Sequence, residues 1–302
     1  MENSPSLLEK KWVVMVAWQV CSVFLCGIAS VCTWLTKING KTLPVTQLAI
    51  SYIILISRNL FFEKPKSIPW GKYFFVSFFN FSGDICSIYA YTMTSLSSSM
   101  ILVTTVIFWV APISYFVFKR SVSLCQGFSL FLGFFGVFIV FLEDGAGDTR
   151  WKGNIIAIVS AMCYAIATVI QEALVHDANP NTYLYGFSST ITPLSLVSIL
   201  IFERKDLLSY NWTKGSIILI LVYAVLMAVY YMMVPQVMQY SNATEMNLSF
   251  LSSNFMSLGV SILAFGQKAS IMYLVGFMCV PFAIALYSLY PNSSSDEKQI
   301  LE

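Results

Sequence analysis

The chain has very few charged residues. Only 11% of its 302 residues are Asp, Glu, Lys or Arg, against about 25% in an average soluble domain. Hydrophobic residues make up 57%, and the mean hydropathy is +0.73. A water-soluble core of this length does not need so many apolar side chains. The shortage of charge therefore excludes an ordinary soluble domain and predicts an integral membrane protein.

Residues for catalysis and metal binding are equally scarce. The sequence holds one histidine, His176, and its seven cysteines are scattered without a C-x-x-C pair. It contains neither a G-x-S-x-G nor an H-E-x-x-H motif. We interpret the cysteines as small apolar packing residues. We accordingly predict no enzyme activity, no metal and no cofactor.

Long apolar stretches fill nearly the whole chain. Each is close to the length of about 20 residues that a helix needs to cross a bilayer. The ten stretches lie at 11–35, 43–62, 70–91, 96–118, 124–142, 152–175, 181–202, 214–238, 245–265 and 271–290. The loops between them leave no room for a soluble domain. The pattern predicts an all-α integral membrane protein with ten transmembrane helices, whose function lies inside the bundle or at its mouths.

The second half of the chain resembles the first at a fixed offset. A shift of 149 residues aligns Lys119 with Lys268 and Gly127 with Gly276 without a gap. Chance similarity between apolar helices is the alternative. Because the offset spans five helices, an odd number, a true repeat is inverted in the membrane, as in many secondary transporters. We therefore expect a tail at 1–10, a first five-helix repeat at 11–142, a connecting loop at 143–151, a second five-helix repeat at 152–290 and a C-terminal tail at 291–302.

The fourth and fifth stretches carry a pattern found in a known family. From Tyr91 to Phe141, small and polar residues enter a helix, Pro112 stands late in it, and a basic turn precedes a glycine-rich helix. This segment resembles the drug/metabolite transporter superfamily. Shorter matches are most like subfamily F of solute carrier family 35: CGIAS at Cys26–Ser30, WGKY at Trp70–Tyr73, YAIATVIQE at Tyr164–Glu172, FERKDL at Phe202–Leu207, NATEMNL at Asn242–Leu248 and FGQKAS at Phe265–Ser270.

The resemblance implies a carrier with the drug/metabolite transporter fold, made of ten helices as two inverted five-helix repeats. It implies that both termini lie in the cytosol and that a central cavity opens to each side in turn. It also suggests a nucleobase, nucleoside or nucleotide-sugar type of solute. The membrane that holds the protein is left open between an endomembrane and the plasma membrane.

An acidic residue stands in the middle of the third stretch. An unpaired Asp84 at that depth costs several kcal/mol on insertion scales, so its side chain is expected to face the interior of the bundle. Asn80 lies one helical turn earlier on the same face. We predict a proton-coupling or substrate-binding pair. The alternative is a carboxyl group that only joins neighbouring helices.

The sixth stretch presents a polar face. Tyr164, Thr168 and Gln171 follow one another at i, i+4 and i+7, with Glu172 beside them near the membrane boundary. We predict that this face lines the cavity and that Tyr164 stacks on, or hydrogen-bonds to, a planar ligand. The alternative is an interfacial tyrosine and a solvated glutamate.

Weaker candidates lie on other stretches. Asn247 and Asn254 form a stripe on the ninth, where either ligand contact or helix-to-helix hydrogen bonding explains a buried amide. Gln19 begins a similar stripe on the first. Lys119 and Lys268 occupy equivalent turns of the two repeats and could attract an anion at opposite mouths, or anchor the helix ends at the interface.

Together these features favour a secondary transporter for a small organic solute. A non-transporting membrane receptor or adaptor is the alternative. The absence of a basic residue in the middle of any stretch favours a neutral or cationic solute. Because the net charge is only +2 and no basic stripe alternates with aromatics, nucleic acid is excluded as a partner. The expected partners are the solute and the bilayer, with a homodimer left open because small residues recur every fourth position at Ala157, Ala161 and Ala165.

Overall fold

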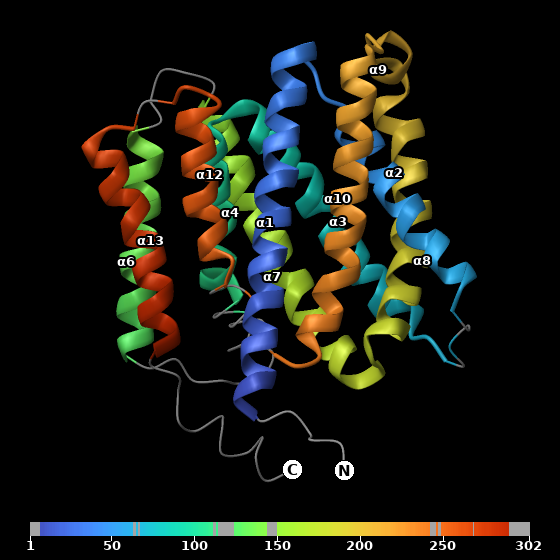
Figure 1. Cartoon of the computed structure of the whole chain (residues 1–302), viewed down its shortest axis with the longest axis horizontal. Helices are drawn as coiled ribbons and strands as arrows, with labels where there is room; N and C mark the ends of the chain where they lie inside the picture. Colours follow the sequence, from blue (N-terminus) through green and yellow to red (C-terminus); the bar gives the residue numbers. More distant parts are fainter. Residues whose placement is uncertain are drawn as a thin grey trace.

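The protein is a bundle of packed helices (Figure 1). The computed structural model describes residues 7–62, 65, 67–110, 113, 124–143, 150–241, 246, 249–267 and 269–289. Within these ranges every regular element is helical. The all-α class expected from the composition is therefore confirmed for the described part of the chain.

The helices follow the apolar stretches closely. In the N-terminal half they are α1 (Leu7–Asn39), α2 (Pro44–Ser57) with the short 3₁₀ helix η1 (Arg58–Leu60), α3 (Trp70–Met93), α4 (Leu96–Val103) and α6 (Leu124–Glu143). In the C-terminal half they are α7 (Arg150–Ala178), α8 (Pro180–Ser198), the π-helical turn η2 (Ile199–Glu203), α9 (Arg204–Ser209), α10 (Lys214–Met238), α12 (Leu251–Leu263) and α13 (Ile271–Leu289).

The fourth stretch departs from the expectation of one continuous helix from 96 to 118. α4 ends at Val103, and a turn at Thr104 and Thr105 separates it from the helical residues 106–110. Both threonine hydroxyls donate to carbonyl groups three residues earlier, Thr104 at 2.9 Å and Thr105 at 2.6 Å. Such local bonds compete with the helical backbone ladder and bend the helix. Of the rest of that stretch, residues 111, 112 and 114–118 lie outside the described residues.

Several helices are long and apolar enough to cross a membrane. By length and composition these are four segments, Trp12–Asn39, Arg150–Ala178, Pro180–Ser209 and Lys214–Met238, with shorter apolar helices at Leu96–Val110, Gly127–Val140 and Ile271–Ala283. Large apolar side chains also point outward, since Leu200 is 69% and Phe202 is 72% exposed. Exposed apolar side chains of this size are suited to contact with lipid rather than water. The chain is therefore a multi-pass membrane protein.

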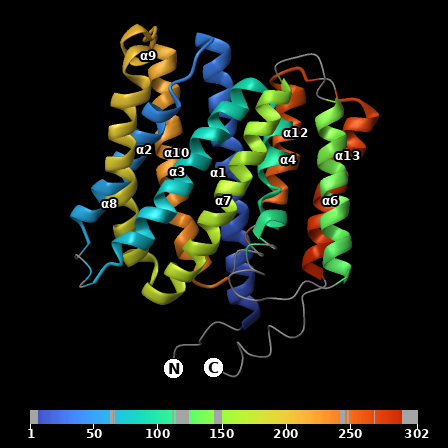
Figure 2. The ribbon, with the colours of Figure 1, turned by 180° about the vertical axis from the view of Figure 1, so that it is seen from behind.

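Figures 1 and 2 show the order of the helices across the bundle. α6 and α13 pack side by side at one edge, α2, α8 and α9 lie at the other, and α1, α3, α7 and α10 fill the middle. α1 runs upward in Figure 1 while α7 runs downward. The pairs α2 and α8, α3 and α10, α4 and α12, and α6 and α13 are opposed in the same way.

Small residues allow the close contacts in this bundle. A Cβ atom placed on Gly136 of α6 would lie 2.8 Å from the carbonyl oxygen of Gly276 on α13, so neither position has space for a larger residue. On α7, Ala157, Ala161 and Ala165 are fully buried within the chain, and α7 packs along α3. These alanines therefore pack against helices of the same molecule, and they give no support to the homodimer that the sequence left open.

Candidate functional site

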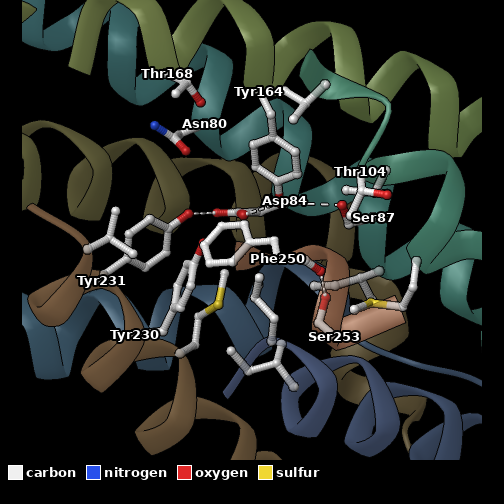
Figure 3. Close-up of a pocket in the computed structure, with 18 of the residues that line it drawn as sticks. Asn80, Asp84, Ser87, Thr104, Tyr164, Thr168, Tyr230, Tyr231, Phe250 and Ser253 are labelled. Atoms are coloured by element: carbon white, nitrogen blue, oxygen red, sulfur yellow. Dashed lines mark hydrogen bonds between the residues drawn. The ribbon is translucent and has the colours of Figure 1, made fainter. Parts of the chain in front are cut away.

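Asp84 lies near the middle of α3 and is only 1% exposed. Its carboxyl group accepts hydrogen bonds from three tyrosine hydroxyls on three other helices. Tyr164 on α7 donates to Oδ1 at 2.6 Å, Tyr231 on α10 donates to Oδ2 at 2.5 Å, and Tyr52 on α2 also donates to Oδ2. Figure 3 shows Tyr164 and Tyr231 converging on the carboxyl group. A single acidic side chain therefore joins helices from both halves of the chain.

The sequence of α3 explains how this site forms. Asn80, Asp84, Ser87 and Tyr91 recur at helical spacing, and all four are buried on one face. Gly83 sits beside them, and a Cβ atom at that position would lie 2.9 Å from the ring of Tyr164. The missing side chain thus lets the tyrosine ring approach the backbone of α3.

A serine pair reinforces the contact between α3 and α7. The hydroxyl groups of Ser87 and Ser160 lie 2.7 Å apart, and Ser160 also donates to the carbonyl of Gly83 at 2.8 Å. Ser87 in turn donates to the hydroxyl oxygen of Tyr164 at 3.3 Å. This bond orients the phenol, which donates its own proton to Asp84. The carboxyl group is therefore held by an ordered network.

A cavity with a volume of about 110 Å³ adjoins Asp84, more than one water molecule requires. Tyrosines and aliphatic side chains make up much of its wall. The polar lining residues are Asn80, Asp84, Ser87, Thr104, Thr168, Gln171 and Ser253, together with the hydroxyl-bearing Tyr91, Tyr164, Tyr223, Tyr230 and Tyr231. No Lys, Arg or His occurs among the described residues that line it. The cavity thus combines aromatic faces with one acidic group.

These groups define what the cavity can do chemically. A carboxylate is an acceptor only, while a protonated carboxyl group can also donate. Hydrogen bonds from the three phenols are charge-assisted when Asp84 is ionised, which makes them stronger than neutral ones. Tyrosine faces attract cations as well as planar rings. The site therefore suits a solute that is neutral or positively charged, or a proton carried by Asp84.

Five of the residues predicted from sequence meet in this cavity. Asp84 and Tyr164 are hydrogen-bonded to each other, and Asn80, Thr168 and Gln171 line the wall around them. The side-chain nitrogen of Asn80 is buried without a hydrogen-bond partner among the described residues. An unsatisfied buried donor is costly, which makes Asn80 ready to donate to a ligand or a water molecule.

The other candidates lie elsewhere. Asn254 is fully buried on α12 and donates to Thr104 of the α4 turn at 3.0 Å, so it joins two helices. Gln19 is exposed and accepts from Ser252 at 2.6 Å. Glu172 is partly exposed and does not line the cavity. Asn247, Lys119 and Lys268 fall outside the described residues.

Sequence reasoning missed two of the three tyrosines that hold Asp84. Tyr52 and Tyr231 stand in strongly apolar stretches, where an aromatic residue has the same pattern as ordinary packing. Both are buried, and their rings are 5.9 Å apart in a tilted contact. A tyrosine in an apolar stretch does indicate that a hydrogen-bond partner is needed, since a buried tyrosine hydroxyl normally has one. The sequence offered no means of pairing these hydroxyls with Asp84.

Comparison with known proteins identifies the family. The model of the SLC35F family, described as solute carrier family 35, matches residues 7–289, which is nearly the whole chain. The chain belongs to solute carrier family 35. This membership agrees with the resemblance read from the motifs, and it points to a solute carrier rather than to an enzyme.

Individual relatives cover most of the chain at low identity. Solute carrier family 35 member F2 of Mus musculus is 24% identical over 91% of this chain and 78% of its own length. The same member from Xenopus tropicalis is 23% identical over 89% of this chain and 74% of its own length. An uncharacterized family 35 member of Schizosaccharomyces pombe, C320.08, is 22% identical over 96% of this chain, which spans 60% of the yeast protein.

A solved crystal structure is similar in fold. It is 13% identical in sequence, aligns with a TM-score of 0.66, and covers 94% of this chain and 98% of the other. At this identity the likeness concerns the arrangement of the helices only. It adds a fold to the family assignment and nothing about the solute.

Proposed function

We propose that this solute carrier family 35 member is a secondary transporter that moves a small organic solute by alternating access through the cavity beside Asp84. The observation that carries the proposal is a buried carboxyl group bonded by tyrosines from α2, α7 and α10. A packing role alone does not require an adjoining cavity lined by polar groups. A transporter requires such a site, at mid-depth and shared by both halves.

We further propose that the helices form two inverted five-helix repeats, within 11–142 and 152–290, as the offset of 149 residues suggests. Helix packing supports this. Each helix of the first repeat has an equivalent in the second: α1 and α7, α2 and α8, α3 and α10, α4 and α12, and α6 and α13. When every helix is replaced by its equivalent, most pairs of contacting helices correspond to another pair that is also in contact. The contact of α1 with α10 becomes that of α7 with α3, and the contact of α1 with α12 becomes that of α7 with α4. The opposed helix directions in Figure 1 support the same arrangement.

The proposed solute is neutral or positively charged. Phosphate groups are usually bound by Arg, Lys or helix N-termini, and no basic residue lines the described cavity. A solute of the nucleobase or nucleoside type therefore fits the cavity better than a nucleotide sugar. Its ring would lie against Tyr164 or Tyr230, with Asn80 and Asp84 as hydrogen-bonding partners.

A two-step experiment tests this function. Metabolites that differ between cells with and without the protein name the candidate solutes without a prior choice. Each candidate is then offered to liposomes that contain only the purified chain. We expect saturable uptake of a neutral or cationic solute. A phosphate-bearing solute whose uptake survives Lys119→Ala and Lys268→Ala would contradict the charge argument, and no uptake of any candidate would favour the receptor or adaptor function.

A further inference from the structure

The N-terminus of α2 is capped by a residue from the other half of the chain. Glu203, at the end of η2, is 4% exposed, and its Oε1 accepts the backbone N–H of Val45 at 2.7 Å. Its Oε2 accepts both the backbone N–H of Thr46 at 2.8 Å and the Thr46 hydroxyl at 2.7 Å. Both carboxylate oxygens are thus bonded to the first turn of α2.

The local sequence leaves this helix end without a cap of its own. Leu43 occupies the N-cap position and has no side chain that can accept a hydrogen bond. Pro44 follows as the first helical residue and lacks an N–H. The N–H groups of Val45 and Thr46 therefore need an acceptor from elsewhere. A carboxylate also interacts favourably with the positive end of the helix dipole.

The geometry of α8 turns Glu203 toward α2. The α-helix ends at Ser198 and passes into the π-helical turn η2, where Leu200, Ile201 and Phe202 are largely exposed while Glu203 is buried. A single π-turn shifts the helix face by one residue and is often found at functional sites. The turn thus sends one acidic side chain inward from an otherwise lipid-facing segment.

Other contacts close the same end of the bundle, which lies at the top of Figure 1. Asn39, at the end of α1, donates to the hydroxyl of Tyr210 between α9 and α10 at 2.6 Å. Leu35, Leu43 and Ile220 pack with Tyr210 as a buried apolar cluster. The first half of the chain is thus joined to the second by the Glu203 cap, by the hydrogen bond from Asn39 to Tyr210 and by this apolar cluster.

The opposite end of the same helix pair is joined differently. Asn59, after α2, donates to Ser188 of α8 at 2.9 Å and to Ser189 at 3.3 Å. These bonds are only partly buried, and Arg58 beside Asn59 donates to Asn181 of α8 in an exposed contact that water screens. The bonds of Glu203 are buried and charge-assisted. The two ends of the α2–α8 pair are therefore unequal, and the end at Glu203 is the more firmly closed.

We infer that Glu203 is a gate latch: its bonds to Val45 and Thr46 hold this end of the carrier shut and break when the end opens. The inference rests on the proposed alternating-access function. It assigns a positioning role to Glu203, which does not line the cavity and does not touch the solute. A carrier that opens toward this end has to separate the two halves here, so the latch lies on the transport cycle.

A native thiol reports whether the latch is open. Cys32 on α1 is fully buried, and its Sγ lies 3.9 Å from Oε1 of Gln47, the residue after Thr46. α1 and α2 both pack on α10 of the second half, so separation of the two halves at this end would expose Cys32. Cys21, also fully buried on α1, lies three turns away toward the other end and serves as an internal reference. Modification of both by N-ethylmaleimide is followed in the full chain by peptide mass spectrometry.

Glu203→Gln removes the charge and replaces one acceptor oxygen by an N–H donor that faces other donors. We expect the modification rate of Cys32 to rise by about tenfold or more, since hydrogen bonds to a charged group contribute more than neutral ones. The rate at Cys21 should stay unchanged. Asp206→Asn is the matched control, because it removes the same charge from an exposed residue of α9 and should leave Cys32 protected.

Thr46→Val keeps the test decisive if the glutamine variant does not fold. It removes one of the three bonds and leaves the carboxylate with both backbone amides. We expect a smaller but measurable increase in Cys32 modification. A Cys32 rate equal to that of the unmodified sequence in the folded variants would overturn the latch.

A second arm locks the latch. Thr46→Cys with Glu203→Cys, bridged by a short bifunctional methanethiosulfonate, should lose solute uptake and regain it on reduction. Undiminished uptake in the bridged protein would mean that transport does not require these helices to separate, and the latch would be rejected. Modification of Cys32 is measured without any solute. If Glu203→Gln raises the Cys32 rate but the protein takes up no candidate solute, the latch is supported and the proposed transport function is contradicted.

Discussion

At the residue scale, Asp84 is the side chain on which uptake should depend most. Its carboxyl group accepts hydrogen bonds from three tyrosines, whereas an asparagine offers one oxygen and two N–H donors. Losing a charged hydrogen-bond partner costs about 1.5–3 kcal/mol, so Asp84→Asn should lower the initial uptake rate by about tenfold or more. If Asp84 carries a proton through the cycle, the remaining uptake should also lose its dependence on pH.

The control for this prediction is Asp177→Asn. Asp177 is exposed at the end of α7 and lies away from the cavity, so uptake and its pH profile should be unchanged. Uptake in liposomes across a series of pH values measures both variants. Full activity of Asp84→Asn with an unaltered pH profile would leave the carboxyl group with the packing role that the sequence also permitted.

At the scale of elements, the approach of α7 to α3 depends on Gly83. An alanine there would place its Cβ 2.9 Å from the Tyr164 ring, and overpacking of this kind typically costs about 1–3 kcal/mol. We expect Gly83→Ala to lower the thermal unfolding midpoint in detergent and to reduce uptake, because the displaced ring carries the hydroxyl that binds Asp84. Gly71→Ala on the same helix meets nothing within 4 Å and should be neutral or stabilising. Equal midpoints for the two variants would contradict the packing argument.

Element boundaries were the part of the fold most readily predicted. α10 matches the expected stretch 214–238 at both ends, and α3 and α13 begin where the hydropathy rises at Trp70 and Ile271. The bend after α4 was not predicted, because Thr104 and Thr105 look like ordinary small residues in an apolar stretch. Their hydroxyl bonds to the backbone depend on the fold around them, since Asn254 from α12 binds Thr104.

At the scale of the whole molecule, the packing of the helices determines which side chains come into contact. This limits what the sequence alone can predict about the site. Asp84 with Asn80, and Tyr164 with Thr168 and Gln171, were predictable because each set shares one helix face. Partners from other helices require knowledge of which helices are neighbours, so Tyr52 and Tyr231 were missed. Glu203 was missed for a related reason, since it stands beside Arg204 and Lys205 in a segment with the charge of a solvated turn.

The inverted arrangement makes a prediction about the molecule as a whole. If the two repeats are opposed in the membrane, the link between α1 and α2 and the link between α7 and α8 lie on opposite sides, although they occupy equivalent places in the two repeats. Lys41 is exposed in the first link, and Asp177 is exposed at the end of α7, directly before the second. In a background with the exposed Cys125 replaced by serine, Lys41→Cys and Asp177→Cys should react with an impermeant maleimide from opposite sides of sealed vesicles.

A third position makes this topology test internally consistent. Asp206 on α9 lies at the same end of the bundle as the link between α1 and α2, so Asp206→Cys should react from the same side as Lys41→Cys. Two repeats inserted in the same orientation would instead label Lys41→Cys and Asp177→Cys together. That outcome would remove the in-plane symmetry, and with it the reason to expect that one cavity beside Asp84 opens to each side in turn.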